Sequence, residues 1–285
     1  MKQILKFISI MDESIEFSLS KPFLLKSIEG LNDVGANHIT YKGINQDGEK
    51  YRSTSIEVRE INIKFIIVAN NSNELLQLRE IINKVFNPKL GEGKLIYTYG
   101  NIKREIKCVT DGTAKMQIKG NKRYCEGEIN LLSYDPYWKD IIKESEIIAT
   151  FIGGWRFKFR LPFKFKQRGE AKKNIINQGH VDTPIEIIFK GPALNPCVIN
   201  NKTGEFIKVT RELTSDDILY ITTEYGNKKV EIERNGVRSN AFNYIDLDST
   251  FFQLKVGDNM IEYTTDNNLE PQSVEIRYRN RYLGV

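Results

Sequence analysis

The chain has few of the residues that most often build catalytic and metal sites. Among its 285 residues are only two histidines, His38 and His180, and three cysteines, Cys108, Cys125 and Cys197. Neither histidine lies near a cysteine in the sequence, so the ligand spacing of a zinc site is absent. The odd number of cysteines argues against a disulfide framework and indicates a protein made in a reducing cytoplasm. We therefore expect no catalytic, metal-binding or cofactor-binding residues.

Long apolar stretches are also missing. No segment approaches the ~18 consecutive apolar residues that a membrane-spanning helix requires. The N-terminal residues 1–8 are briefly apolar, but Lys6 interrupts them, Asp12 and Glu13 follow, and no small-residue cleavage site is present. This pattern favours a first strand over a signal sequence, and it predicts a protein without a membrane span.

Two fragments look like parts of functional motifs, and each has a simpler explanation. Residues 91–94, Gly-Glu-Gly-Lys, lack the remaining spacing of a phosphate-binding loop and its Ser or Thr, so we interpret them as a turn. Asp246 and Asp248 lie on one face of a short extended run, with Asp258 close in sequence. Paired carboxylates can perform acid–base catalysis or bind calcium. The neighbouring hydroxyl residues favour a turn instead.

Four tyrosines in the C-terminal half offer a further alternative. Tyr220, Tyr225, Tyr244 and Tyr263 would either form a sugar-stacking face or pack in the core and at its rim, and we favour packing. With no metal spacing and no phosphate loop, the aspartates are the only acid–base candidates that remain, and they have the turn explanation given above. We therefore predict that the protein is not an enzyme.

Strand-forming sequence is abundant. Hydrophobic residues make up 40% and charged residues 28% of the chain, and the net charge of +5 is spread among interspersed lysines and acids. The 15 phenylalanines and 13 tyrosines lie largely in short alternating runs, which suit a pleated, half-buried surface. A chain of this length is expected to form two domains, each with its own core. The predicted fold class is mainly β.

Residues 1–138 are predicted to form an antiparallel β-sandwich-like domain with one packed helix. The clearest strand covers 55–68, and its apolar phase changes near residues 59–60, which indicates a bulge or a bend. Apolar residues over 75–86 then recur at helical spacing, and Pro88 ends the predicted helix. A single amphipathic helix among strands must lie on a sheet to bury its apolar stripe.

Short strands separated by turn dipeptides follow this helix. They are predicted over residues 95–99, 102–108, 114–118 and 124–133. The last strand ends at residues 135–138, Asp-Pro-Tyr-Trp, because Pro136 lacks a backbone N–H and fixes φ. We expect an antiparallel meander that closes the first domain, with Tyr137 and Trp138 largely buried where the domains meet.

Residues 139–172 are predicted to be a connector that carries an arm. Phenylalanines alternate there with lysine and arginine around Pro162; they are Phe157, Phe159, Phe163 and Phe165. Such a strip suits either a polyanion such as nucleic acid or a bent strand whose phenylalanines face a core. Because the alternation is regular, we favour the strand and predict no direct readout of nucleic acid.

Residues 173–285 are predicted to form a second domain, a β-sandwich. Its strands are expected over residues 185–189, 218–222, 230–233, 251–254, 260–264 and 274–278. Glycine-containing turns separate them, and this spacing is typical of sandwiches.

Several short motifs together resemble the distal tail proteins of long-tailed bacteriophages. In the first domain they are residues 59–63 (Arg-Glu-Ile-Asn-Ile), 78–79, 87–88, 93–97 and 135–138. In the second domain they are residues 177–179, 183–185, 191–192, 195–196 and 254–261. Their shared order, which extends over nearly the whole chain, makes the resemblance specific.

The resemblance implies a structural component of a phage tail tip or baseplate. Proteins of this family form hexameric rings through the first domain, which join the tail tube to the hub and host-adhesion apparatus, and the second domain is a galectin-like β-sandwich. It thus implies a homo-hexamer, with tail tube and hub or adhesion proteins as partners, in a virion assembled in the host cytoplasm. The alternative is a carbohydrate-binding module protein that recognises a host cell-surface glycan.

Overall fold

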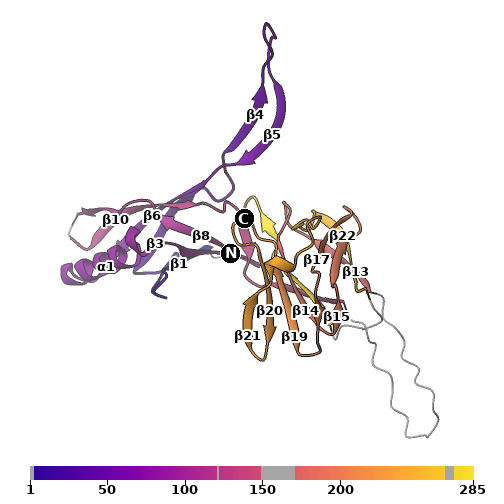
Figure 1. Ribbon diagram of the computed structural model, residues 1–285. Coiled ribbons are helices and arrows are strands. Elements are labelled where there is room, and N and C mark those ends of the chain that lie inside the picture. The colour runs from indigo at the N-terminus through magenta and orange to yellow at the C-terminus, as the bar shows by residue number, and fades with distance from the viewer. Residues whose placement is uncertain (1–2, 121, 149–170, 267–272) are drawn as a thin grey trace. The chain divides into compact units, whose positions relative to one another are not determined.

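The computed structural model, shown in Figure 1, describes residues 3–120, 122–148, 171–266 and 273–285. Two compact units make up the chain. The first comprises Met1–Ile141 together with Tyr282–Val285, and the second comprises Ile142–Arg281. The described residues are mostly in antiparallel strands and include one α-helix, so the predicted mainly-β class is confirmed. The limits of these units differ from the domain boundaries expected at residues 138 and 172. The segment expected to be a connector is divided between the two units, and the last four residues belong to the first unit.

The first unit combines a large antiparallel sheet, a separate two-stranded hairpin and one helix. Its elements are β1 (Gln3–Ile8), β2 (Ser14–Phe17), β3 (Phe23–Glu29), β4 (Ala36–Tyr41), β5 (Lys50–Ile56), β6 (Arg59–Val68), α1 (Ser72–Val85), the 3-10 helix η1 (Pro88–Leu90), β7 (Gly93–Tyr99), β8 (Ile102–Thr110), β9 (Lys115–Lys119), β10 (Tyr124–Ser133), β11 (Trp138–Asp140) and β24 (Arg281–Tyr282). The sheet has the strand order β2-β1-β7-β8-β10-β6-β3, with β9, β11 and β24 attached beside it. A bridge between Ser18 and Leu24 brings its two edges together.

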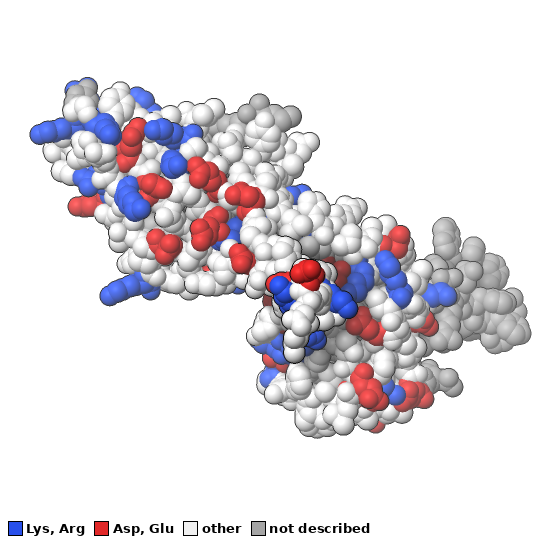
Figure 2. Space-filling model, turned by 90° about the horizontal axis from the view of Figure 1, so that it is seen from above, with Lys and Arg blue, Asp and Glu red and all other residues white. Residues whose placement is uncertain are grey.

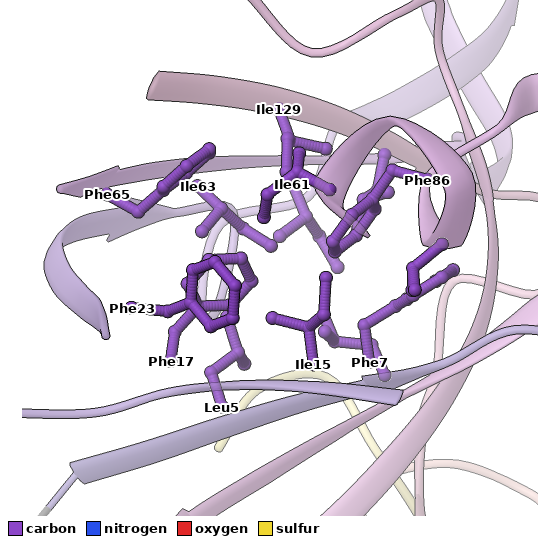
Figure 3. Close-up of a cluster of buried hydrophobic side chains, with 14 of the residues drawn as sticks. Leu5, Phe7, Ile15, Phe17, Phe23, Ile61, Ile63, Phe65, Phe86 and Ile129 are labelled. Carbon is purple, nitrogen blue, oxygen red and sulfur yellow. The ribbon is translucent and has the colours of Figure 1, made fainter. Parts of the chain in front are cut away.

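Successive side chains of these strands point to opposite faces, so one set of large apolar side chains gathers on one face of the sheet and forms the core in Figure 3. The ring of Phe17 lies 5.0 Å from that of Phe65, and Phe7 stacks on Phe86 at 4.5 Å between ring centroids. Phe86 ends α1, so this stacking attaches the helix to the sheet. Ile82 of the same helix is fully buried, and α1 thereby covers its apolar stripe.

The predicted helix is present, and it begins slightly earlier than expected. The side chain of Asn71 accepts a hydrogen bond from the backbone N–H of Glu74 at 2.9 Å, and the Glu74 carboxylate accepts one from the N–H of Asn70 at 2.7 Å. This reciprocal capping satisfies amides that have no partner inside the helix. At the other end, Pro88 opens η1 and the α-helix stops before it, as predicted.

The strand predicted over residues 55–68, with a bulge or a bend near residues 59–60, is two strands that lie in different sheets. β5 ends at Ile56 and pairs with β4, whereas β6 begins at Arg59 and lies in the large sheet. Every second residue of β6 is buried, whereas β4 and β5 contain no buried position. The change of apolar phase therefore marks the point where the chain leaves an exposed hairpin and enters the core.

The predicted meander is interrupted between β8 and β9. β7 pairs with β8, but β8 and β9 both pair with β10 rather than with each other. β9 lies along residues 124–128 of β10, and β8 reaches it at Leu131 and Leu132. The ten-residue β10 is long enough to hold both partners along one edge, so the link between them is not a hairpin turn.

The second unit is a β-sandwich, as predicted. Its elements are β12 (Glu144–Ile148), β13 (Lys172–Asn177), β14 (Ile185–Lys190), β15 (Ala193–Leu194), β16 (Cys197–Asn200), β17 (Glu205–Lys208), β18 (Glu212–Leu213), β19 (Asp217–Thr222), β20 (Lys229–Arg234), β21 (Val237–Asn240), η2 (Phe242–Tyr244), β22 (Gly257–Thr264) and β23 (Ser273–Tyr278). The larger sheet has the order β12-β23-β14-β19-β20-β21, and the smaller one β13-β22-β16-β17. Phe189 and Tyr263, one from each sheet, meet edge to face at 5.9 Å within the shared core.

Two predictions for this half of the chain need correction. Residues 144–148, assigned to the connector, form β12 and pair with β23 at the edge of the larger sheet. Residues 251–254 form no strand, because Leu254 makes only an isolated bridge with Thr183. The phenylalanine strip at residues 157–165 lies outside the described residues.

An ion pair between the buried Asp217 and the partly exposed Arg234 ties the ends of β19 and β20 together. The carboxylate of Asp217, only 1% exposed, accepts two hydrogen bonds from the Arg234 guanidinium at 2.7 Å, and others from the amide and hydroxyl of Thr214. The hydrogen bonds from Arg234 hold the pKa of Asp217 well below its ordinary value. This stabilisation is therefore complete above the unfolded-state pKa, near about 4, and is lost as the pH falls towards the folded-state pKa.

We expect Asp217→Asn to lower the urea midpoint of unfolding at pH 7, and the difference from wild type to shrink progressively below about pH 4. Urea titrations followed by circular dichroism from neutral to acidic pH measure both effects. Asp216→Asn, at the exposed neighbouring position, is the matched control. A difference that stays constant down to about pH 2 would show that the Asp217 charge is not what stabilises this corner.

Candidate assembly surfaces

The residues considered for catalysis or metal binding are dispersed. His38 lies on β4 with Nδ1 2.8 Å from Oγ1 of Thr54, whereas His180 is an exposed residue of the second unit. All three cysteines are buried, and burial raises the pKa of each thiol. Within the described ranges, no group of histidines, cysteines and carboxylates is arranged to hold a metal ion. No helix in those ranges is long and apolar enough to cross a membrane.

The aspartates and the glycine-rich fragment have turn and surface roles. The carboxylate of Asp246 accepts a hydrogen bond from the backbone N–H of Asp248 at 2.9 Å, which closes a turn. Asp258 instead accepts a hydrogen bond from the Asn174 side chain at 2.7 Å. Of residues 91–94, the first two connect η1 to β7 and the last two begin β7. The predicted turn is therefore present at Asp246 and Asp248, whereas Asp258 lies in β22 and residues 93–94 lie in β7.

The four tyrosines do not form one stacking face. Tyr263 is buried in the core. The guanidinium of Arg238 lies 3.7 Å from the ring centroid of Tyr220, and that of Arg211 lies 4.5 Å from the ring centroid of Tyr244. Of the four, Tyr225 is the one that is largely exposed, at 76%. Packing in the core and at its rim therefore describes three of the four rings, so these four tyrosines do not form a shared stacking platform.

The hairpin of β4 and β5, residues 36–56, projects from the first unit and is termed the arm (Figure 1). Neither strand has a buried side chain, and the exposed ones include Ile39, Tyr41 and Tyr51. At the tip, Ile44 is 98% exposed. An isolated two-stranded hairpin is at best marginally stable in water. The arm therefore presents apolar side chains that only a surface outside its own hairpin can bury.

The two faces of the arm differ in character. On one face, Nδ1 of His38 and the Tyr51 hydroxyl lie 2.8 Å and 2.9 Å from the Thr54 hydroxyl. On the other, Ile39 and Tyr41 stand two residues apart on β4 and therefore side by side. Elsewhere on the surface displayed in Figure 2, basic and acidic side chains are interspersed, as the composition predicted. The apolar face of the arm is thus a candidate contact surface.

A buried arginine at the base of the arm holds several segments together. Arg59 is 0% exposed and donates hydrogen bonds to the backbone carbonyls of Gly30, Leu31, Asp33, Pro136 and Leu283. These acceptors lie on the loop before the arm, in the Asp-Pro segment at residues 135–138, and in the C-terminal tetrapeptide, residues 282–285. Burial lowers the pKa of the Arg59 guanidinium, and the nearby Asp33 carboxylate opposes that shift. We term this side chain and its acceptors the arginine knot.

Trp138 lies next to the arginine knot, within the core of the first unit. It is 0% exposed, and its indole Nε1–H donates a hydrogen bond to the Leu31 carbonyl at 3.1 Å. Tyr137 is only partly buried, so the expectation of two largely buried aromatics is correct for Trp138 alone. The core cluster that contains Trp138 belongs to the first unit, and a place for Trp138 where the domains meet stays a prediction.

The C-terminal tetrapeptide is fastened by several contacts that sequence reasoning missed. The Arg104 guanidinium stacks over Tyr282 at 3.4 Å from the ring centroid and also donates to the Gly284 carbonyl. The N–H of Val285 donates to the Asn32 side chain at 3.0 Å. No local sequence signal marks this return, because all of its partners lie more than a hundred residues away.

Comparisons with known proteins match both units. The model of a phage tail protein RIFT-related domain matches residues 13–133, and that of the siphovirus-type tail component, C-terminal domain, matches residues 178–282. The fold is similar to the solved structure of phage SPP1 Dit (gp 19.1), with a TM-score of 0.70 and 14% identity over 97% of this chain and 98% of that one. That protein is described as a paradigm of the hub adsorption apparatus in phages that infect Gram-positive bacteria.

Two baseplate structures show the same fold. A chain of the phage P2 baseplate in its activated conformation with calcium has a TM-score of 0.58 and 13% identity, with complete coverage of both chains. The corresponding strontium structure has a TM-score of 0.57 at 13% identity, again with complete coverage. A search of curated proteins found no match.

Two β-rich units, matched in order by two tail-protein models, define a structural component of a phage tail or baseplate. The chain belongs to the siphovirus-type distal tail protein family, and the resemblance noted in its sequence is confirmed.

Proposed function

We propose that six copies of this chain form a ring through their first units. On this proposal the ring joins the tail tube to the hub and host-adhesion proteins at the virion tail tip, after assembly in the host cytoplasm. The protein acts by shape and contact rather than by catalysis. The ring with its tail tube and hub partners is what the family resemblance implies, and the arm is the observation that supports it.

The arm supports a ring because it exposes apolar side chains along both of its strands and has no buried position of its own. If it contacts a different surface on the next copy, the contact is head to tail, and such contacts close into rings when the rotation between copies is a simple fraction of a turn. The apolar face at Ile39 and Tyr41 would then be buried in every copy. Burial of large side chains supplies roughly 1.5–3 kcal/mol each, so the arm can contribute substantially to each contact.

Native mass spectrometry of the purified chain tests the ring, and a species of about 198 kDa is expected from six copies of 33.0 kDa. We expect the double variant Ile39→Asp/Tyr41→Asp to remain monomeric at concentrations where the wild type is hexameric, with an unchanged melting temperature for the monomer. The control is Val237→Asp, which changes an exposed apolar residue of the second unit. Any other subunit count in the assembled particle would defeat the proposal.

A further inference from the structure

The tip of the arm is a hydrogen-bonded turn that exposes one apolar side chain next to a carboxylate. The backbone N–H of Gln46 donates to the Gly43 carbonyl at 3.2 Å, and the N–H of Gly43 donates to the Gln46 side chain at 3.1 Å. This turn presents Ile44, which is 98% exposed. Asp47 follows on the same tip and is exposed as well. The tip therefore combines one large apolar side chain with one acid.

The first unit also contains a pocket suited to such a group. Its volume is about 470 Å³, and it lies between the end of α1 and the start of β9. Phe86, Pro88, Ala114 and Met116 give it apolar walls, and Arg79 lines it as well. Nε of Arg79 is shielded from solvent and has no hydrogen-bond partner among the described residues. A buried donor without an acceptor is destabilising, so an acceptor brought into this pocket would be favoured.

The positive charge at the pocket favours a docking segment that carries an acidic residue. Arg79 is the charged residue among those that line the pocket, and Lys115 lies between the lining residues Ala114 and Met116 at the start of β9. The arm of one copy does not serve its own pocket in this structure, because it projects away from the sheet while α1 lies at the other end of the unit (Figure 1). A second copy of the chain supplies both the apolar side chain and the carboxylate that the pocket lacks.

We infer that the arm tip of one copy docks in the α1–β9 pocket of the next, with Ile44 against the apolar walls and Asp47 facing Arg79. This inference rests on the proposed ring and names its contact. The donor surface and the receiving surface are different parts of the unit, so the contact is head to tail, as ring closure requires. A segment of a hub or tube protein in the same pocket is the competing occupant.

Cysteine cross-linking tests the contact in the full chain. Ile44→Cys and Thr113→Cys change two exposed residues, one at the tip and one on the pocket rim, while the three native cysteines are buried. Under mild oxidation we expect the double variant to form a covalent ladder that ends at six copies. The control pairs Ile44→Cys with Lys119→Cys, at the far end of β9, and should give no ladder.

The outcomes separate the inference from the proposed ring. A hexamer in native mass spectra without cross-links between positions 44 and 113 overturns the docking site and leaves the ring standing, and the pocket then becomes the candidate site for a hub or tube segment. Failure of the wild type to assemble under any condition, in isolation or in the particle, overturns the ring and the inference together. Equal ladders for both cysteine pairs also overturn the docking site, since they indicate unspecific collisions.

Charge reversal supplies an independent readout. We expect Asp47→Lys and Arg79→Asp each to raise the concentration needed for assembly by at least about tenfold, and the combined variant to restore it. If Arg79→Asp does not fold by circular dichroism, Arg79→Gln replaces it, and Asp47→Lys should then weaken assembly less in the Arg79→Gln background than in the wild type. Strictly additive effects of the two changes would contradict the pairing.

Discussion

Trp138→Ala should destabilise the first unit by about 3–5 kcal/mol, the range for emptying a large aromatic site in a core. The side chain is 0% exposed, and its indole N–H donates to the Leu31 carbonyl, so the substitution leaves a cavity and removes one of the two hydrogen bonds that this carbonyl accepts. Chemical denaturation followed by far-ultraviolet circular dichroism measures the loss. Tyr134→Ala, four residues earlier and 66% exposed, is the matched control and should change stability by well under about 1 kcal/mol. An unchanged unfolding midpoint for Trp138→Ala would mean that Trp138 does not support the core.

Arg59→Met is expected to cost about as much, roughly 3–5 kcal/mol, because removing a buried cation leaves its hydrogen-bond partners unsatisfied. Methionine keeps the length of the side chain but cannot donate to any of the carbonyls that Arg59 contacts. Arg59→Lys should also destabilise the unit, since a single ammonium cannot reach acceptors spread around a planar guanidinium. Denaturant titrations of the full chain measure both variants.

The control for the arginine knot is Arg52→Met, an exposed arginine on β5 of the arm, which should leave unfolding unchanged. Deleting the last three residues gives a second view of the same knot, because it removes the Leu283 carbonyl and the Gly284 contact to Arg104 while Arg59 itself remains. We expect this deletion to destabilise the first unit less than Arg59→Met. If Arg59→Met unfolds at the wild-type midpoint, the knot holds nothing together.

Local sequence patterns were sufficient wherever structure depends on neighbouring residues. The 3.6-residue spacing of apolar side chains and Pro88 placed α1, because helix periodicity and the effect of proline are local properties. Alternation likewise located β6, β10 and β14, although it could not name their partners.

The sequence by itself determined the class: β-rich units with one helix on a sheet, and an ordered set of motifs that resembles distal tail proteins. Tertiary structure alone decided that residues 50–56 leave the core for an exposed arm, that β8 and β9 share β10, and that the C-terminus returns to the first unit. It also decided that Arg59, which belongs to a residue type that is usually exposed, is fully buried. Alternation specifies only which side chains share a face, whereas strand partners and buried charges depend on contacts between residues far apart in the chain.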